Sequence, residues 1–250
     1  MFGKKEVFEW LSHRAGVKRL DKMPLIDVTK ALELNKPSRS FIDSFGKHDI
    51  WGFAGFIDLV DFSKQVMGLP NKAMSDYLAP FLKGLVDLVN SHYGLVDKTI
   101  GDEVMFILPD MEEDGGVPAV LEMGQLLGGI YDLQKQLGEK YSFRIGLAYG
   151  GLYIDQVCGV GYSEWTTVGE VVNLAKRLHI LKELKDLGGV KGAFGVLCHE
   201  QYAMEYFESI LSIIAGVASR MTHKILKDPV TNLKGVSAAR CALLVPKSED

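Results

Sequence analysis

Two aspartates stand where strand-like apolar runs give way to turns. Asp58 follows the apolar run 50–57, and Asp102 lies in the Gly-Asp turn between the runs 94–100 and 103–109. Carboxylates fixed at strand ends can hold hard cations such as Mg²⁺, which prefer oxygen ligands and keep positions open for substrate phosphates. The pair therefore predicts a magnesium site and phosphoryl-transfer chemistry on a nucleotide. The alternative is that both are exposed turn residues that cap a strand and a hairpin.

The elements that must position these aspartates alternate between strands and helices. The aromatic, glycine-containing run 50–57 is typical of a buried central strand, and residues 94–109 predict a hairpin that turns at the Gly-Asp pair. Apolar residues at three- and four-residue steps predict an amphipathic helix over 73–92. This alternation predicts an α/β (α+β) fold. Further expected elements are helices after residue 116 to about 137, at about 169–185 and at 199–214, and strands at 143–154, 190–197 and 242–245.

The composition bounds the class of protein. The 250 residues are 47% hydrophobic and 24% charged, which is ordinary for one folded domain with an extension. A polar break at 36–40 separates a predicted N-terminal helical arm, residues 1–47, from a main domain, residues 48–250. The net charge of −4 argues against strong, salt-dependent binding to nucleic acid.

The basic residues at the N-terminus meet a polar, helix-like stretch, and no window of the sequence reaches the length of a membrane span. Three cysteines (Cys158, Cys198 and Cys241) and six histidines are scattered without the spacing of a zinc site. We therefore expect a cytoplasmic protein with reduced thiols and no membrane partner.

Three segments together resemble the catalytic domain of class III nucleotidyl cyclases, the adenylate and guanylate cyclase family. They are residues 56–63 (FIDLVDFS), residues 98–102 (KTIGD) and residues 166–178 (TTVGEVVNLAKRL), with residues 144–146 (RIG) ahead of the third. The resemblance covers about residues 50 to 180. It implies a central, mostly antiparallel sheet flanked by helices, and conversion of a nucleoside triphosphate to a 3′,5′-cyclic monophosphate and pyrophosphate.

The resemblance also implies roles for individual residues. Asp58, Asp102 and the backbone carbonyl of Leu59 would hold two Mg²⁺ or Mn²⁺ ions. Asn173 and Arg177, four apart on a predicted helix, would orient the ribose and stabilise negative charge on the α-phosphate. The alternative for Asn173 and Arg177 is a solvated helix face.

Substrate contacts and assembly follow from the same resemblance. Phe62 and Ser63 would offer backbone N–H groups and a hydroxyl to the triphosphate, and Lys98 and Thr166 match positions that face the base. Members of the family complete each site across a head-to-tail dimer. The resemblance therefore implies a homodimer in which one chain supplies the two aspartates and the other the asparagine and arginine, so that one chain alone is inactive.

The sequence departs from the family pattern at three positions. Asp61 stands where a glycine usually lies, and a carboxylate there would repel phosphates or restrict the loop. Gly151 falls where some relatives have a phosphate-binding arginine, and Val236 where some have a lysine, which leaves Lys234 as a nearby substitute.

The identity of the base depends on two opposed signals. The matched lysine and threonine favour adenine, hence ATP. Large aromatics, Trp51, Phe53, Phe56 and Trp165, would narrow a base site towards a pyrimidine wherever they border it, although most are expected in the core. The compact architecture also resembles the bacterial pyrimidine cyclases of Pycsar anti-phage systems. UTP is therefore the first expectation, with cyclic UMP read by a separate effector protein, and ATP is the second.

Two other classes of function remain open at this stage. A non-catalytic cyclase-like module would bind a nucleotide or a partner and signal by dimerising, but such modules are expected to lose metal or transition-state residues. A polymerase-like two-metal domain would need a basic channel for a template, which the net charge of −4 does not suggest.

Overall fold

The computed structural model describes residues 48–109, 119–159, 162–184, 190–197, 206–218, 220–231, 234–236 and 238–247. The predicted helical arm, residues 1–47, lies outside the described residues, so the division into arm and main domain stays a prediction. Within the described ranges, no helix is long and apolar enough to cross a membrane.

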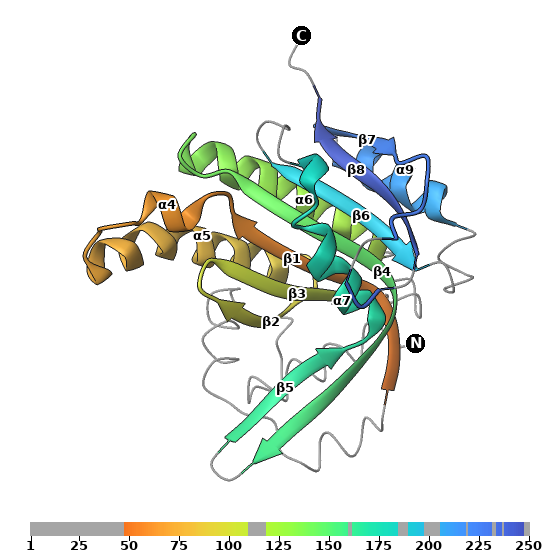
Figure 1. Cartoon of the computed structure of the whole chain (residues 1–250), viewed down its shortest axis with the longest axis horizontal. Helices are drawn as coiled ribbons and strands as arrows, with labels where there is room; N and C mark the ends of the chain where they lie inside the picture. The colour runs from red at the N-terminus through yellow and green to blue at the C-terminus, as the bar shows by residue number, and fades with distance from the viewer. Residues whose placement is uncertain are drawn as a thin grey trace.

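The core of the fold is one mixed sheet with the strand order β2-β3-β1-β4-β6-β8-β7 (Figure 1). Its central strand β1 pairs antiparallel with β3 on one side and β4 on the other, and among the described strands only β4 and β6 run parallel. The prediction of a mostly antiparallel sheet flanked by helices is confirmed. The strands are β1 (His48–Leu59), β2 (Leu95–Ile100), β3 (Glu103–Pro109), β4 (Phe143–Gly159), β5 (Tyr162–Val168), β6 (Lys191–Leu197), β7 (Met221–Ile225) and β8 (Ala239–Pro246).

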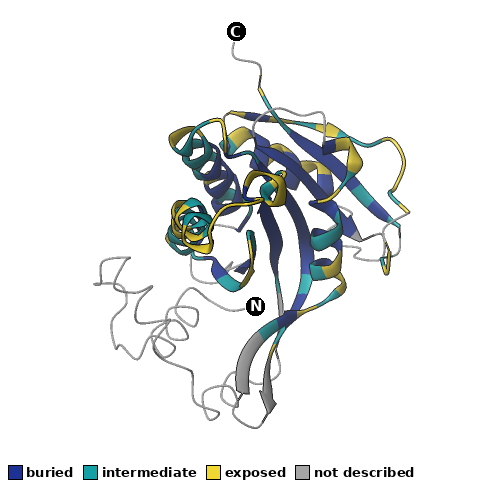
Figure 2. Cartoon of the chain, turned by 60° about the vertical axis from the view of Figure 1, so that its left-hand side comes forward, coloured by how far each residue is buried: buried dark blue, intermediate teal, exposed yellow. Residues whose placement is uncertain are grey.

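Side chains alternate across β1, so the strand serves two cores. Phe53 and Ile57 belong to a cluster formed with the helices α5 (Asn71–Ser91), α6 (Ala119–Leu137) and α9 (Phe207–Val217). Ala54 and Phe56 belong to a second cluster on the opposite face, formed with α7 (Glu170–Leu178). Figure 2 shows the strands buried between these layers, with the exposed residues on the outer sides of the helices. Asp58 shares the α7 face of β1.

The close packing of α7 on the sheet depends on Gly146, which has no side chain. A Cβ on Gly146 of β4 would lie 2.1 Å from the carbonyl oxygen of Ala175 and 2.4 Å from the backbone nitrogen of His179. Only glycine leaves room for this approach of helix to strand. The Arg-Ile-Gly segment thus fixes how near α7 comes to β1 and β4.

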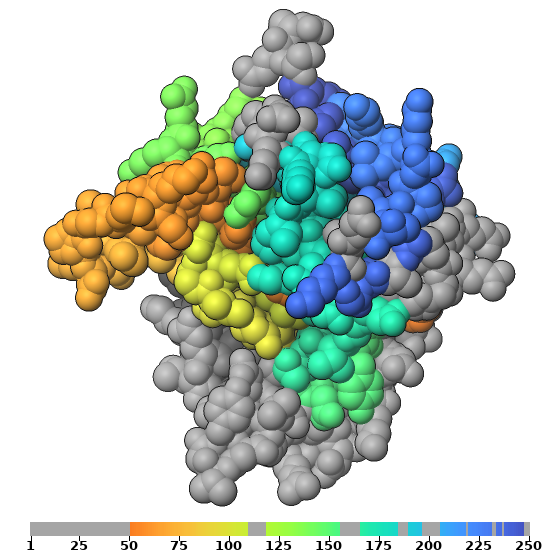
Figure 3. All heavy atoms as spheres, in the orientation of Figure 1, coloured from red at the N-terminus to blue at the C-terminus, as the bar shows by residue number. Residues whose placement is uncertain are grey.

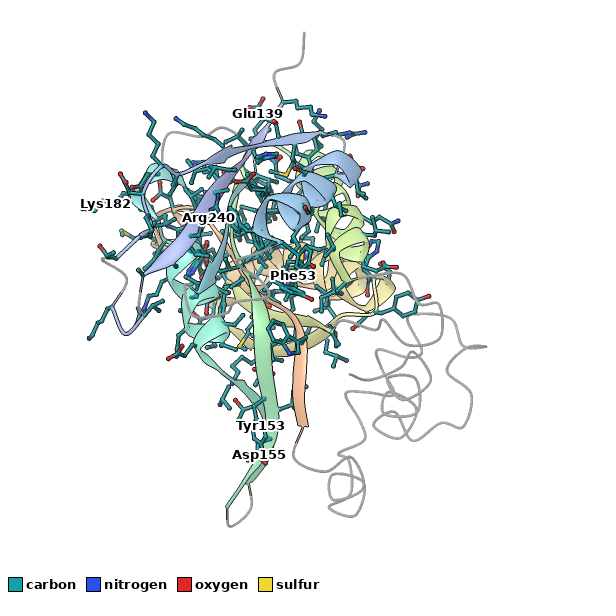
Figure 4. The ribbon with its side chains drawn as sticks, turned by 90° about the vertical axis from the view of Figure 1, so that its right-hand side faces the viewer. Phe53, Glu139, Tyr153, Asp155, Lys182 and Arg240 are labelled. Carbon is teal, nitrogen blue, oxygen red and sulfur yellow. The ribbon has the colours of Figure 1, made fainter. Side chains whose placement is uncertain are left out.

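Several predicted boundaries are wrong. The helix expected over 169–185 ends at Leu178 and is followed by a 3₁₀ turn, Lys182–Leu184. Strand β4 runs to Gly159 and pairs with β5, which the sequence did not predict as a strand; the pair extends away from the body, as Tyr153 and Asp155 in Figure 4 illustrate. Strand β7, with only five residues at the sheet edge, was also not predicted.

Candidate active site

The structure brings the two predicted metal-binding aspartates together. Asp58 is the penultimate residue of β1, and Asp102 follows Gly101 in the β2–β3 turn, where Gly101 has φ of 63°. The backbone N–H of Leu59 donates a hydrogen bond to Oδ2 of Asp102, with an N···O distance of 3.3 Å. Because β3 pairs directly with β1, the hairpin carries Asp102 to the end of β1.

Asp58 is not an exposed turn residue, which corrects the alternative interpretation for this position. It is 8% exposed and is paired with Arg144, its cross-strand neighbour on β4. The guanidinium donates Nε to Oδ1 at 2.9 Å and Nη2 to Oδ2 at 2.6 Å. This two-point geometry is the strong form of an arginine–carboxylate pair. The sequence marked Arg144 only as part of a motif and missed its role as the partner of Asp58.

The charge of Asp58 affects the pKa values of both Arg144 and Asp102. The hydrogen bond to Asp58 raises the pKa of Arg144 above its ordinary value. Burial raises the pKa of the Asp102 carboxyl, and the negative charge of Asp58 adds to that rise. Two carboxylates therefore lie close enough to repel each other, with one guanidinium as counter-charge.

A divalent cation fits this donor set. The described residues hold no group of three or more His, Cys, Asp and Glu side chains placed to bind a metal, but Mg²⁺ is commonly held by one or two carboxylates plus substrate phosphates and water. The backbone of Leu59 adjoins Asp102 through its N–H, and its carbonyl is the third donor that the family resemblance implies. Asp58, Leu59 and Asp102 are the oxygen donors that would hold the ions.

A second cluster lies beside the aspartates and joins β3 to α7. Lys176 forms an ion pair with Glu103, the residue that follows Asp102. His179 places Nε2 3.4 Å from Oε2 of Glu103 and 3.7 Å from Oδ2 of Asp58. Burial lowers the pKa of His179, and the two carboxylates oppose that shift. No local pattern predicted this cluster, because its members are far apart in the chain and His179 is one of six scattered histidines.

The turn after β1 leads into Phe62 and Ser63, the residues predicted to bind the triphosphate. Helix α4 (Phe62–Gln65) follows it, and Ser63 is exposed in its first turn, where backbone N–H groups have no partner within the helix. Phe62 packs against the core cluster formed with α5, α6 and α9. Asp61 adopts φ of 57°, a left-handed conformation that favours glycine, and its carboxylate accepts a hydrogen bond from Lys64 at 2.9 Å. The pairing with Lys64 lowers the pKa of Asp61 and offsets part of its negative charge.

The predicted transition-state residues lie on a different side of the same chain. Asn173 and Arg177 belong to α7, as expected; Asn173 is exposed, and Nε of Arg177 donates to the carbonyl oxygen of Lys234 at 3.2 Å. Lys234, the proposed substitute for the missing lysine, is exposed beside them. On the face of the molecule in Figure 3, α7 is open to solvent next to the β2–β3 hairpin. No contact joins Asn173 or Arg177 to the aspartates of the same chain among the described residues.

The two predicted base contacts touch each other. Nζ of Lys98 on β2 donates to Oγ1 of Thr166 on β5 at 3.1 Å, so residues 68 positions apart form one polar pair. Lys98 also lies 3.3 Å from Oδ2 of Asp97. Thr166 is half-buried, as is Lys98.

The aromatic residues of β1 are divided between the two faces of the sheet. Phe53 is fully buried in the core cluster formed with α5, α6 and α9. Its ring centroid is 4.8 Å from that of Tyr149, and Figure 4 places it inside the body. Trp51 packs against the same core. Both occupy odd positions and so point away from the face that carries Asp58. Of these aromatic residues of β1, Phe56 alone shares the face of Asp58.

Comparison with solved structures decides the fold. The adenylyl cyclase CyaB from P. aeruginosa superposes with a TM-score of 0.57 at 18% identity and covers 82% of this chain and 98% of its own. The guanylate cyclase domain of RhGC from Catenaria anguillulae, solved with GTP, gives 0.57 at 17% identity over 80% of this chain and 98% of its own. The chain has the cyclase fold.

A third similar structure, the guanylyl cyclase Cya2, has a TM-score of 0.55 at 15% identity over 82% of this chain and 96% of its own. No protein-family model matches the chain, and no curated protein sequence matches it. The assignment of the cyclase fold thus rests on the structural similarity alone. The roles of individual residues rest on their geometry.

Proposed function

We propose that this chain is a nucleotidyl cyclase that converts a nucleoside triphosphate to a 3′,5′-cyclic monophosphate and pyrophosphate. In this reaction the ribose 3′-oxygen forms a bond to the α-phosphorus. The bond from that phosphorus to the oxygen bridging to the β-phosphate breaks, pyrophosphate leaves with the electron pair, and the 3′-hydroxyl proton passes to solvent. The cyclase fold and the juxtaposed carboxylates Asp58 and Asp102 support this reaction class.

The residues divide the work between binding and charge stabilisation. Asp58, Asp102 and the Leu59 carbonyl would hold two Mg²⁺ or Mn²⁺ ions, which lower the pKa of the 3′-hydroxyl and neutralise the triphosphate when bound. The first turn of α4, with Phe62 and Ser63, would bind the triphosphate through backbone N–H groups. Asn173 would orient the ribose, and Arg177 would stabilise charge on the α-phosphate because its guanidinium is permanently charged and planar.

One observation carries the proposal of a composite site. Arg177 reaches the Lys234 carbonyl on the outward side of α7, whereas Lys176 and His179 occupy the side that faces the aspartates. We infer from this difference that the aspartates and Arg177 of one chain act on different phosphates. A head-to-tail homodimer would present Asn173 and Arg177 of one protomer to the aspartates of its partner, giving two sites per dimer.

We propose UTP as the substrate, with cyclic UMP read by a separate effector in anti-phage defence. Support comes from the resemblance of the compact architecture to the bacterial pyrimidine cyclases. The aromatic residues of β1 add no support, because Phe56 packs in one core cluster and Trp51 and Phe53 pack in the other. ATP is the second candidate, and the hydrogen-bonded pair Lys98–Thr166 favours it, since an amine and a hydroxyl can donate to and accept from an adenine edge.

The test is incubation of the pure protein with an equimolar mixture of ATP, GTP, CTP and UTP and with Mg²⁺ or Mn²⁺, followed by identification of products by mass. We expect cyclic UMP and pyrophosphate, with at least tenfold less of the purine products, since one missing or unpaired polar contact is worth about 1–3 kcal/mol. The Asp58→Ala variant serves as the control for contaminating activity. Dominant cyclic AMP would overturn the choice of UTP, and no cyclic nucleotide from any substrate would favour a non-catalytic module.

A further inference from the structure

Helix α7 has two functional sides, and the proposed chemistry uses only one of them. Asn173 and Arg177 occupy the outward side, where Arg177 contacts the Lys234 carbonyl. Lys176, the residue before Arg177, forms an ion pair with Glu103, and His179 lies near Glu103 and the metal-binding Asp58 of the same chain. In a head-to-tail dimer, α7 therefore touches the metal-binding half of one active site and supplies the transition-state half of the other.

The inward contacts of α7 end on the acidic cluster itself. Lys176 pairs with Glu103, whose side chain is only 12% exposed, and Glu103 directly follows the metal-binding Asp102. His179 lies 3.7 Å from Oδ2 of Asp58 and 3.4 Å from Oε2 of Glu103. The ring of Phe56, two residues before Asp58, stacks on the His179 ring at 6.2 Å and lies 5.2 Å from Nζ of Lys176.

The backbone of α7 is held so that these contacts move together. Nδ1 of His179 lies 2.5 Å from the carbonyl oxygen of Lys176, the residue that precedes Arg177. Gly146 brings the backbone of Ala175 and His179 against β4 without an intervening side chain. A displacement of Lys176 or His179 by a change of charge at the aspartates is therefore passed to Arg177, because packed elements shift as units.

We propose that the contacts of Lys176 and His179 with Glu103 and Asp58 couple the two active sites of the dimer. Cation occupancy at the aspartates of one protomer sets the position of its own α7, and so the turnover of the site that this α7 serves in the partner. Lys176 is on this view a positioning residue. The inference rests on the composite site proposed above, and it names a link that the reaction itself does not require.

A pair of heterodimers with one live site tests the coupling. In a dimer of wild type with Arg177→Ala, the live site takes its arginine from a wild-type chain whose own aspartates are intact. In a dimer of Asp58→Asn with Arg177→Ala, the live site has the same residues, but its arginine comes from a chain whose metal site is broken. We expect at least about fivefold lower turnover per live site in the second dimer, the low end of common coupling energies. Equal turnover would overturn the proposal.

The Lys176→Met variant, which keeps the length of the side chain and removes its charge, tests the assigned route. Placed in the chain that donates Arg177, it should lower turnover of the first heterodimer to that of the second and erase the difference between them. Glu103→Gln in the same chain should have the same effect. Lys182→Met, an equal change at an exposed lysine in the following 3₁₀ turn, should leave the difference intact. Persistence of the difference in Lys176→Met and Glu103→Gln would exclude this route.

A measurement without nucleotide separates this inference from the proposed function. Hydrogen exchange of the α7 amides from Leu174 to His179 should slow by about fivefold when Mn²⁺ is added to the wild-type protein, because the cation fixes the cluster that α7 contacts. The response should be absent in Lys176→Met and present in Lys182→Met. No response in the wild type, or equal responses in the two variants, would overturn the coupling, whether or not a cyclic nucleotide is formed.

Discussion

Asp58 combines two tasks that are usually carried by different residues. It is a predicted metal ligand, and it is also the buried partner of Arg144, bound through both carboxylate oxygens. A cation that binds Asp58 must share it with this guanidinium. The arginine thus lowers the free energy of the metal-free state and orients the carboxylate through its two hydrogen bonds.

Replacement of Asp58 should therefore damage the fold as well as catalysis. We expect Asp58→Ala to reduce turnover by about a hundredfold or more, since a lost metal ligand removes several kcal/mol of transition-state stabilisation. It should also lower the free energy of unfolding by about 1–3 kcal/mol, because Arg144 keeps its charge but loses its partner. Asp58→Asn should lose as much turnover but less stability, since the amide oxygen still accepts from Arg144. Urea unfolding and initial rates measure both effects; an Asp58→Ala protein as stable as wild type would contradict the role of the pair.

In the absence of metal, the Asp102 carboxylate should lower the stability of the fold, whereas Asp58 raises it. Its pKa is raised by burial and by Asp58, so the ionised carboxylate is disfavoured in the folded state. The resulting loss of stability is complete above the raised folded-state pKa, shrinks as the pH falls through that pKa, and is absent below the ordinary pKa of 3.8, where both states are protonated.

Asp102→Asn should consequently raise the metal-free stability near pH 7.5, by less than about 1 kcal/mol because the site is half exposed and screened. The gain should vanish by about pH 3.5, and the stabilisation by Mn²⁺ should be lost at every pH. Thermal unfolding with EDTA and with Mn²⁺ across this range provides the measurement. A variant less stable than wild type at pH 7.5 in EDTA would show that the Leu59 hydrogen bond outweighs the repulsion from Asp58.

At the scale of elements, the contact of α7 with β4 is the joint on which the candidate site depends. Gly146→Ala should lower the free energy of unfolding by about 1–3 kcal/mol or more, because its Cβ would lie 2.1 Å from the Ala175 carbonyl oxygen and force α7 outward. Gly216→Ala in α9 is the matched control: it meets nothing within 4 Å and should be neutral or stabilising, as alanine is in an exposed helix. If the two changes had equal effects on stability and turnover, the close contact of α7 with β4 would not be what positions the candidate site.

The elements also show what the sequence could and could not predict. Strand β1, the β2–β3 hairpin and α5 follow from local patterns, and the meeting of Asp58 with Asp102 follows from strand ends that pair. The Asp58–Arg144 pair spans 86 positions and depends on the register of β1 against β4, which no local pattern specifies. Strand β5 pairs with its sequence neighbour β4 from Gly159 and Tyr162 onwards, and this local hairpin was missed in the sequence analysis.

The positions of the aromatic residues in β1 carried a signal that the sequence analysis did not use. Asp58 and Phe56 share the parity of their numbers in β1, whereas Trp51 and Phe53 have the other parity and must point to the opposite face of a regular strand. Parity alone thus separates Trp51 and Phe53, which pack in one core cluster, from Phe56, which packs in the other. No comparable signal marked His179 and Lys176, because their partners on β1 and β3 became neighbours only when Gly146 allowed α7 to approach.

At the scale of the whole molecule, the separation of Arg177 from the aspartates predicts complementation between inactive chains. Asp58→Ala and Arg177→Ala homodimers should each lose turnover by about a hundredfold or more. After subunit exchange, half of the dimers contain one chain of each kind, and one of the two sites in such a dimer receives every wild-type group. Independent sites would restore about one quarter of wild-type turnover, and coupling through α7 would lower that fraction about fivefold, still well above either homodimer.

The matched control is a mixture of Asp58→Ala with Asp102→Ala. Both changes fall in the same half of the composite site, so every site in the mixed dimer lacks one metal ligand and no activity should return. Exchange is verified by recovering both chains on a tag carried by only one of them. Recovery in neither mixture, with exchange demonstrated, would place the complete site within a single chain and would contradict the outward orientation of Arg177 as a functional one. Recovery only in the mixture with Arg177→Ala would mean that the catalytic unit is the dimer, because each chain then lacks in its own site what it supplies to the other.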